Sequence, residues 1–273
     1  MPEGDTIHRT ARNLATALAG RPLVRFETPR RRGVVPPRGT RVDAVEARGK
    51  HLLVRFADGL VLHTHLQMHG SWHLYRAGQP WRRSPRQARV VLEVEGGTVA
   101  VCFSAPVVEV VPERALGAAG LGALGPDLGA ADPDLDDVLQ RLDRLDAATQ
   151  VGVALLDQRV AAGIGNVYKS EVCFQHGLDP FTPVGALDAE TRRALYDTAA
   201  RLLRANLTTA RRVTVGGAPA GTLAVYGRAG RPCRRCGAPV RARRQGEHAR
   251  VTYWCPACQP PVRSAATPPI EEA

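Results

Sequence analysis

The sequence lacks a long apolar run. None of its 273 residues lies in a stretch that approaches the roughly 18 to 20 consecutive apolar residues of a membrane span. The N-terminus also lacks the cationic and then apolar pattern of a secretory signal. Hydrophobic residues nevertheless make up 44% of the chain, which is enough for an ordinary core. We therefore expect a folded cytoplasmic protein that does not enter membranes.

Lysine is nearly absent. Lysine and arginine together number 37, yet only Lys50 and Lys169 are lysines. A compositional bias towards arginine explains most of the cations, but it does not explain the two lysines that remain. Both are therefore candidates for a specific role.

A disulfide framework is absent as well. Two of the six cysteines, Cys102 and Cys173, lie singly in the apolar runs "VAVCFS" and "SEVCFQ". Each is expected to behave as a small buried hydrophobe. The other four have the spacing of metal ligands, so no disulfide is needed, in agreement with a reducing compartment.

Positive charge is present in excess. The formal net charge is +11 and the sequence pI is about 10.1. Residues 211–250 contain ten arginines and one acid, whereas residues 132–148 are acidic on balance. A polarised basic face suits a polyanion, most commonly a nucleic acid. The alternative is a general surface charge that serves only solubility.

The patterns along the chain indicate an α+β protein. A helical pattern at 5–20 is followed by short strand patterns with tight turns, which favour a β-sandwich. Helical periodicity returns after a stretch rich in glycine, alanine and proline. We expect a β-sandwich with an N-terminal helix at 1–114, a linker at 115–133, a helical domain at 134–222, a four-cysteine zinc hairpin at 223–260 and a flexible tail at 261–273.

Two CxxC pairs predict a metal site. Cys233 and Cys236 form the first pair and Cys255 and Cys258 the second, with eighteen residues between the pairs. Two such turns can complete a tetrahedral set of four thiolates, which is typical of Zn²⁺. Four protein ligands leave no open position, so we expect one structural zinc ion. The alternative, a redox pair, is disfavoured because there are two pairs in a cationic segment.

A glycine turn separates two helical patterns in "LLDQRVAAGIGNVYKSEVCF". Asn166 stands at the start of the second helix, whose free N–H groups and positive dipole end could bind a phosphate. An ordinary helix–helix turn with an asparagine cap explains the pattern about as well. Lys169, one turn later, favours the phosphate.

The N-terminus "MPEG" offers an unusual nucleophile. Methionine is ordinarily removed before proline, which would leave the secondary amine of Pro2 as the first atom of the mature chain. Such an amine can attack an aldehyde-like carbon and form an iminium, and Glu3 offers a carboxyl group for proton transfer. The alternative is an incidental Pro-Glu start.

In combination, these features resemble a known family. The stretches "MPEG", "ARGKHLL", "LLDQRVAAGIGNVYKSEV", "VYGRAGRPCRRCG" and "YWCPACQ" are similar to those of formamidopyrimidine-DNA glycosylase and endonuclease VIII, the base-excision DNA repair glycosylases. The resemblance extends through nearly the whole chain. It implies that the helical domain is a helix-two-turn-helix domain and that DNA lies in the cleft between the domains.

The resemblance also implies roles for individual residues. Pro2 would attack C1′ of the damaged nucleotide, and the resulting Schiff base would lead to strand cleavage by β- and δ-elimination. Glu3 matches the carboxylate that protonates the sugar, and Lys50 matches the lysine that contacts DNA phosphate and assists catalysis. Asn166 and Arg250 match the asparagine and arginine that hold phosphates beside the everted nucleotide.

The turn in "HTHLQMHGSW" aligns with the loop that fills the void left by the everted nucleotide. Gln67, Met68 and His69 are the candidate void-filling residues, with Met68 as an apolar wedge or, alternatively, a core residue. Four histidines between 63 and 73 suggest a metal, but "VLHTHLQ" has strand alternation and no carboxylate cluster is nearby. We expect no second metal site.

Three departures from the family pattern matter for function. Thr6 stands where many relatives have glutamate, and Asp5 replaces a small residue or proline. The void-filling loop matches neither branch of the family closely. The segment 212–226 is short, which, like "MPEG", favours the endonuclease VIII branch and oxidised pyrimidines.

The expected partner is damaged DNA in duplex, bubble or single-stranded form, bound by a monomer that in a bacterium would associate with the nucleoid. One alternative is a protein of the same fold that binds damaged or abasic DNA with little turnover. Another is a transcription or RNA-binding module whose N-terminus has no catalytic role.

Overall fold

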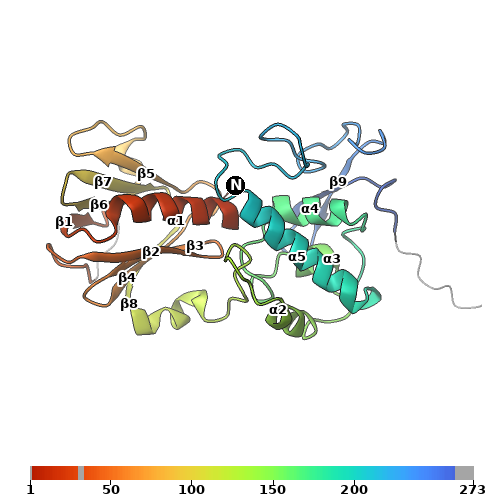
Figure 1. The fold of residues 1–273 in the computed structure, drawn as a ribbon, viewed down its shortest axis with the longest axis horizontal. Helices are drawn as coiled ribbons and strands as arrows, with labels where there is room; N and C mark the ends of the chain where they lie inside the picture. The colour runs from red at the N-terminus through yellow and green to blue at the C-terminus, as the bar shows by residue number, and fades with distance from the viewer. Residues whose placement is uncertain (1, 30–33, 262–273) are drawn as a thin grey trace, which may run out of the picture.

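The computed structural model describes residues 2–29 and 34–261. Met1, whose removal the proposed nucleophile requires, lies outside these ranges, as does the predicted flexible tail apart from Pro261. The described chain forms two lobes joined by a narrower waist, with the N-terminus at the junction (Figure 1). No helix among the described residues is long and apolar enough to cross a membrane.

The first lobe is a β-sandwich with one helix. Helix α1 (Gly4–Leu18) buries Ile7, Ala11, Leu14 and Leu18 along one face, as its 3.6-residue periodicity predicts. One antiparallel sheet has the order β1 (Leu23–Glu27), β6 (Ala88–Val94), β7 (Thr98–Phe103), β5 (Ser71–Arg76). The other has the order β2 (Val42–Arg48), β3 (His51–Phe56), β4 (Leu60–His65), β8 (Val107–Pro112). The predicted sandwich is confirmed.

The core of this lobe lies between the two sheets and under α1. Leu52 and Leu62 of one sheet pack in the same cluster as Val90 and Leu92 of the other, with Leu14 of α1. Strand residues alternate between this core and the outer faces because successive side chains point to opposite sides.

The segment 115–133, predicted as a linker, connects the lobes and packs against both. Leu121 and Leu124 form a buried cluster with Leu53 and Val61 of the sandwich and with Ala162 of the helical lobe. The connection is therefore an apolar contact as well as a stretch of chain.

The second lobe is helical. Its helices are α2 (Leu135–Leu142), α3 (Val151–Ala154), α4 (Asn166–Gln175) and α5 (Ala189–Ala205). The Asp134 and Asp188 side chains cap α2 and α5. Tyr168 of α4 is fully buried in the core of this lobe, which also contains Leu195 and Leu203 of α5.

The C-terminal hairpin packs on the helical lobe. Strands β9 (Arg241–Gln245) and β10 (Arg250–Trp254) pair antiparallel. A small cluster that includes Phe174 of α4, Val225 and Val240 joins the hairpin region to α4.

Candidate active site

A cavity of about 780 Å³ lies where the sandwich, the helical lobe and the hairpin meet. Its lining includes Pro2 and Lys50 of the sandwich, Asn166 of α4 and Arg250 of β10. Residues separated by more than 200 positions therefore come together at one site. With Gln67, Met68 and Lys169, the cavity brings together seven of the residues that the sequence predicted.

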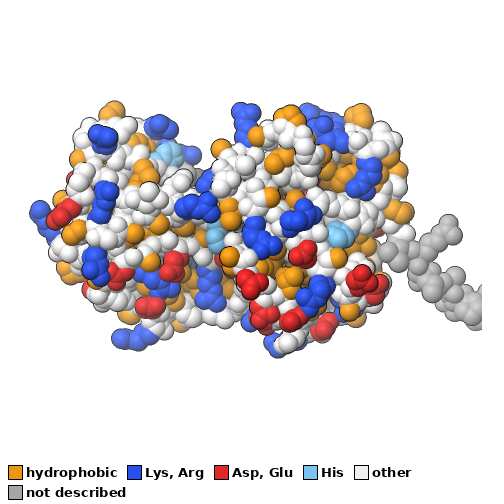
Figure 2. All heavy atoms as spheres, viewed as in Figure 1, with side chains coloured by type: hydrophobic (Ala, Val, Ile, Leu, Met, Phe, Trp, Pro, Cys, Tyr) orange, Lys and Arg blue, Asp and Glu red, His pale blue; other side chains and the backbone are white. Residues whose placement is uncertain are grey.

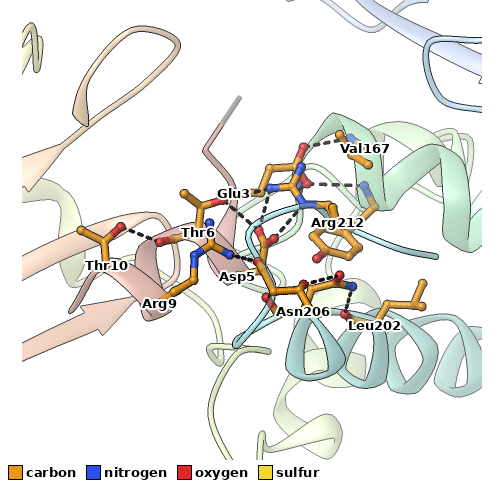
Figure 3. Close-up of polar contacts among 12 residues, drawn as sticks. Glu3, Asp5, Thr6, Arg9, Thr10, Val167, Leu202, Asn206 and Arg212 are labelled. Carbon is orange, nitrogen blue, oxygen red and sulfur yellow. Dashed lines mark hydrogen bonds and ion pairs between the residues drawn. The ribbon is translucent and has the colours of Figure 1, made fainter. Parts of the chain in front are cut away.

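Glu3 lies beside this cavity but has no exposed surface. Its carboxylate accepts hydrogen bonds from the backbone N–H groups of Gly165 (3.1 Å), Val167 (2.8 Å) and Tyr168 (3.4 Å), and Figure 3 shows it directed at the start of α4. The free N–H groups and the positive dipole end of a helix favour such an anion. The anion that the structure contains at this helix terminus is therefore Glu3, and a phosphate contact of Asn166 stays a prediction.

The two glycines of the turn permit this contact. The N–H of Gly4 donates to the carbonyl of Gly163 (2.9 Å), which has a φ of +110°. A Cβ on Gly165 would lie 2.2 Å from Cδ of Glu3. Glycine is therefore required here so that the N-terminal segment can approach closely, and not because a ligand binds the turn.

Asp5 and Thr6, the departures from the family pattern, bind the same arginine. Arg212 donates from Nε and Nη2 to the Asp5 carboxylate, both at 2.7 Å, and from Nη2 to Thr6 Oγ1 at 3.1 Å. Asp5 is 2% exposed, and Arg212 also lies over the ring of Tyr168. As Figure 3 shows, this ion pair joins the first turn of α1 to the segment after α5.

Lys50 lies in the turn between β2 and β3, which is held by the segment that connects the lobes. The N–H of Gly49 donates to the carboxylate of Asp127 (2.7 Å), which also contacts His8 Nε2 (2.9 Å). Gly49 has a φ of +59°, and a Cβ there would lie 2.7 Å from Ala162 Cβ. Asp127 lies in the segment predicted as a linker, so its role was missed in the sequence.

The pKa of the Lys50 amine is lower than that of a free lysine. Burial lowers its pKa to about 8; the carboxylate of Glu3 opposes this shift, and the cation of Arg250 adds to it. The amine is therefore close to half protonated in mildly alkaline solution. Such a lysine can both bind a phosphate and transfer a proton.

The burial of Lys169 was not apparent from the sequence. It borders the cavity but is fully buried, and its ammonium donates to Thr252 Oγ1 (2.6 Å). Burial lowers its pKa to about 8. In this conformation the ammonium is bound within the protein, and the proposed phosphate contact stays a prediction.

Asn166 and its neighbours on α4 fix the position of the hairpin. Asn166 Nδ2 donates to the carbonyl of Val251 (2.6 Å), and Ser170 Oγ accepts from the N–H of Tyr253 (3.4 Å). With the Lys169–Thr252 bond, three consecutive residues of β10 bind one face of α4. Asn166 is the first residue of the helix and does not cap it. Its Oδ1 is buried and has no hydrogen-bond partner among the described residues.

Arg250 is the first residue of β10, is exposed and lines the cavity. Gln67 and Met68 also line it, from the turn between β4 and β5, whereas His69 is exposed in the same turn. Met68 is 51% exposed, which excludes the alternative that it is a core residue.

The four predicted metal ligands converge. The Sγ atoms of Cys233, Cys236, Cys255 and Cys258 all lie within 4.8 Å of one another. Sγ of Cys233 is 3.9 Å from that of Cys258, and Sγ of Cys236 is 3.5 Å from that of Cys255. A Zn–S bond length of about 2.3 Å gives sulfur separations close to these in a tetrahedron. The set is suited to a zinc ion.

Glu171 is a buried carboxylate that the sequence analysis missed. It accepts from the N–H groups of Ala224 (2.7 Å), Val225 (2.9 Å) and Tyr226 (2.8 Å) and from the hydroxyl of Thr214. These bonds close the short exposed loop 215–223 at its base.

The surface charge is polarised. Figure 2 shows acidic side chains gathered over the end of the helical lobe that contains α2, away from the hairpin. The hairpin strand β9 instead exposes Arg241, Arg243 and Arg244. The hairpin therefore carries exposed arginines in addition to Arg250.

The sequence of this chain is similar to those of known proteins. Residues 1–106 match the formamidopyrimidine-DNA glycosylase N-terminal domain, and residues 124–215 match the formamidopyrimidine-DNA glycosylase H2TH domain. A Streptomyces coelicolor protein named "Probable endonuclease 8 2" is 47% identical over 264 residues, covering 95% of this chain and 94% of that protein. The Mycolicibacterium smegmatis protein "DNA-(apurinic or apyrimidinic site) lyase Nei2" is 41% identical, covering 95% and 99%.

A solved structure has the same fold. The Lactococcus lactis Fpg in complex with DNA containing an abasic site superposes with a TM-score of 0.79 at 21% identity, over 95% of this chain and 100% of that one. Together with the sequence relatives, this fold places the chain in the formamidopyrimidine-DNA glycosylase and endonuclease VIII family, on its endonuclease VIII side.

Proposed function

We propose that this DNA glycosylase/AP lyase of base excision repair removes oxidised pyrimidines, with the secondary amine of Pro2 as its nucleophile. The observation that supports this most directly is the position of Pro2. It lines a cavity together with Lys50, Asn166 and Arg250, and the residue that follows it is anchored by three hydrogen bonds.

In the proposed reaction the Pro2 nitrogen attacks C1′ of an everted nucleotide, and the damaged base leaves with the electron pair of the glycosidic bond and takes a proton from water. The proton released by the amine passes to the Glu3 carboxylate and then to the ring oxygen, O4′, whose bond to C1′ breaks to give an iminium. Loss of a proton from C2′ expels the 3′ phosphate, and a second elimination expels the 5′ phosphate. The three N–H groups around Glu3 hold its carboxylate beside Pro2, where it stabilises the iminium.

Lys50 and Arg250 are suited to hold the phosphates of the damaged strand. Both side chains line the cavity, one from the sandwich and one from the hairpin. Phosphate contacts of this kind fix the register of the strand without reading its sequence. Gln67 and Met68 then stand in position to enter the duplex when the nucleotide leaves it.

The four-cysteine site would hold a zinc ion with a structural role. All four positions of a tetrahedral ion are filled by thiolates, so no position remains for a substrate or water. Cys233, Cys236, Cys255 and Cys258 therefore stabilise the fold of the hairpin that presents Arg250.

Lesion preference follows from the short segment 212–226, whose ends are fixed by Arg212 and Glu171. We expect single-turnover base excision to be at least about tenfold faster for an oxidised pyrimidine than for an oxidised purine, since pocket contacts discriminate by about 1–3 kcal/mol. Borohydride trapping on matched duplex, bubble and single-stranded substrates measures this. Equal or reversed rates would contradict the pyrimidine assignment, and binding without an adduct would favour the non-catalytic alternative.

Gly165→Ala tests the anchoring of Glu3. The new Cβ would overlap the Glu3 side chain, and displacing that carboxylate by about 1 Å is expected to lower the rate of base excision by about 100-fold. Gly117→Ala is the matched control, because a Cβ at Gly117 meets nothing within 4 Å. The account of the glycine turn fails if the two variants have the same excision rate.

Arg250→Ala tests the phosphate contact of the hairpin. Each phosphate contact releases counterions, so the slope of log Kd against log salt concentration should fall by about 1. Arg193→Ala removes an exposed arginine that pairs with Asp136 on the acidic side and should leave the slope unchanged. An unchanged slope in Arg250→Ala would remove Arg250 from the DNA interface.

A further inference from the structure

Four ionisable side chains share the outer face of the sheet β2-β3-β4-β8. His51 of β3 is paired with His65 of β4, and His63 of β4 is paired with Glu109 of β8. Directly paired residues in an antiparallel ladder point to the same side, as do residues two apart. The reaction proposed above uses none of the four.

Three of these residues form a hydrogen-bonded chain. Glu109 Oε2 lies 3.2 Å from His63 Nδ1, and His63 Nε2 lies 2.8 Å from His51 Nδ1. An ionised carboxylate can only accept, so His63 carries its proton on Nδ1. Its Nε2 then has a free lone pair and accepts from the Nδ1–H of His51. Both tautomers are therefore fixed by the charge of Glu109.

The chain ends at the cavity. The ring centroid of His51 lies 4.7 Å from that of His65, and His65 lines the cavity with Pro2 and Lys50. His63 is 2% exposed, whereas the Glu109 side chain is 32% exposed. The chain thus runs from a partly exposed carboxylate, through a buried imidazole, to the wall that faces the nucleophile.

The surroundings keep the three imidazoles neutral. Burial, together with the neighbouring histidines, Lys50 and Arg48, lowers the pKa of His51 to about 3. Burial and Lys50 lower the pKa of His65 to about 4. Burial also lowers the pKa of His63, although Glu109 opposes the shift. Glu109, Lys50 and Arg48 are charged groups that act on the pKa values of this cluster.

We propose that Glu109, His63 and His51 are positioning residues that fix the orientation and tautomers of the imidazoles beside Lys50, and through His65 shape the wall of the active-site cavity. The proposal rests on the proposed function. If Glu109 is removed, His63 can place its proton on Nε2, the form preferred by a free imidazole. His51 must then reverse its own tautomer, so that its Nε2 changes from an acceptor to a donor.

The first test does not depend on activity. Long-range ¹⁵N–¹H NMR spectra of the histidine side chains report which ring nitrogen is protonated. We expect Nδ1–H for His63 and His51 in the wild-type protein, and Nε2–H for both in Glu109→Ala. Nε2–H at His63 in the wild-type protein, or spectra that do not change in Glu109→Ala, would refute the chain.

The second test measures elimination at a preformed abasic site in single-turnover experiments at saturating and subsaturating enzyme. We expect Glu109→Ala and His51→Phe to lower the maximal rate by about tenfold, with little change in the half-saturating enzyme concentration. Removing the hydrogen-bond partner of a functional histidine typically lowers activity by about 10- to 100-fold, and we expect the lower value. His51→Asn retains an N–H near the Nδ1 position and should restore most of the rate. Exposed Glu95 in the β6–β7 turn supplies the control, Glu95→Ala.

The pH profile separates positioning from folding. Because Lys50 loses its proton near pH 8, the alkaline limb of the elimination rate should shift in Glu109→Ala and not in Glu95→Ala. If the wild-type protein cleaves and the variants have the same rates and the same alkaline limb of the pH profile, the positioning role is refuted. The proposed function would then still stand. A wild-type protein that does not cleave the abasic duplex would refute the proposed function, and with it the role of the chain.

Discussion

Placing one additional residue ahead of Pro2 is expected to abolish the covalent adduct with abasic DNA. The extension converts the secondary amine into an amide, whose nitrogen has no basic lone pair and cannot form an iminium. Pro2→Gly, which leaves a primary amine without the constraint of the ring, should lower adduct formation by about 100-fold through loss of orientation. Borohydride trapping followed by denaturing electrophoresis measures both effects.

Binding provides the control for these variants. Neither change alters Lys50, Asn166 or Arg250, which line the rest of the cavity, so affinity for an uncleavable abasic analogue should stay within about threefold, less than 1 kcal/mol. An extended chain that still forms the adduct would show that a different amine reacts.

Removing zinc is expected to abolish DNA binding while the sandwich stays folded. The hairpin has only a small apolar cluster against α4, and structural zinc contributes about 10–16 kcal/mol in isolated zinc-finger peptides. Without the ion, β9 and β10 should separate from α4, which removes Arg250 from the cavity. Hydrogen exchange should then be fast in residues 228–259 and unchanged in β3, β4 and β7.

Addition of Zn²⁺ after the chelator should restore both protection and DNA affinity. Cys236→Ser should have the same effect as chelation, because it removes one of the four ligands. Cys102 lies in the sandwich core, so the control Cys102→Ser should leave the hairpin intact. A zinc-free protein that binds DNA with undiminished affinity would contradict the structural role of the metal.

Features that depend on short sequence separations could be predicted. The spacing of Ile7, Ala11, Leu14 and Leu18 specifies a helix, and the two CxxC pairs specify a four-cysteine cluster, both of which the structure contains. Turn signals between alternating segments were enough to predict the sandwich. These patterns reflect local geometry that the sequence displays directly.

Features that depend on long-range contacts could not be predicted from the sequence. The helix terminus after Gly165 looked like an anion site, and it is one, but the anion is Glu3, 162 positions earlier in the chain. Lys169 looked like a surface cation because a sequence shows charge and not burial. Asp127, in a segment that looked like a linker, holds the turn that contains Lys50.

The departures at positions 5 and 6 also acquire a physical explanation. Asp5 forms an ion pair with Arg212, and Thr6, at the position where many relatives have glutamate, accepts a hydrogen bond from the same arginine. Because this pair is buried, loss of either partner would leave an uncompensated charge. The ion pair fixes the start of α1, next to Pro2, to the base of the loop 215–223. It thus provides a polar contact near the position where the glutamate is missing.

The most direct test of the central claim is to locate the amine that forms the adduct. Apart from the N-terminus, the chain offers only two primary amines, those of Lys50 and Lys169, so peptide mass mapping of the borohydride-reduced complex has three possible results. We predict that the sugar remnant is attached to a peptide that begins at Pro2, in protein that has lost Met1. A remnant on either lysine, or full activity in protein that retains Met1, would contradict the account.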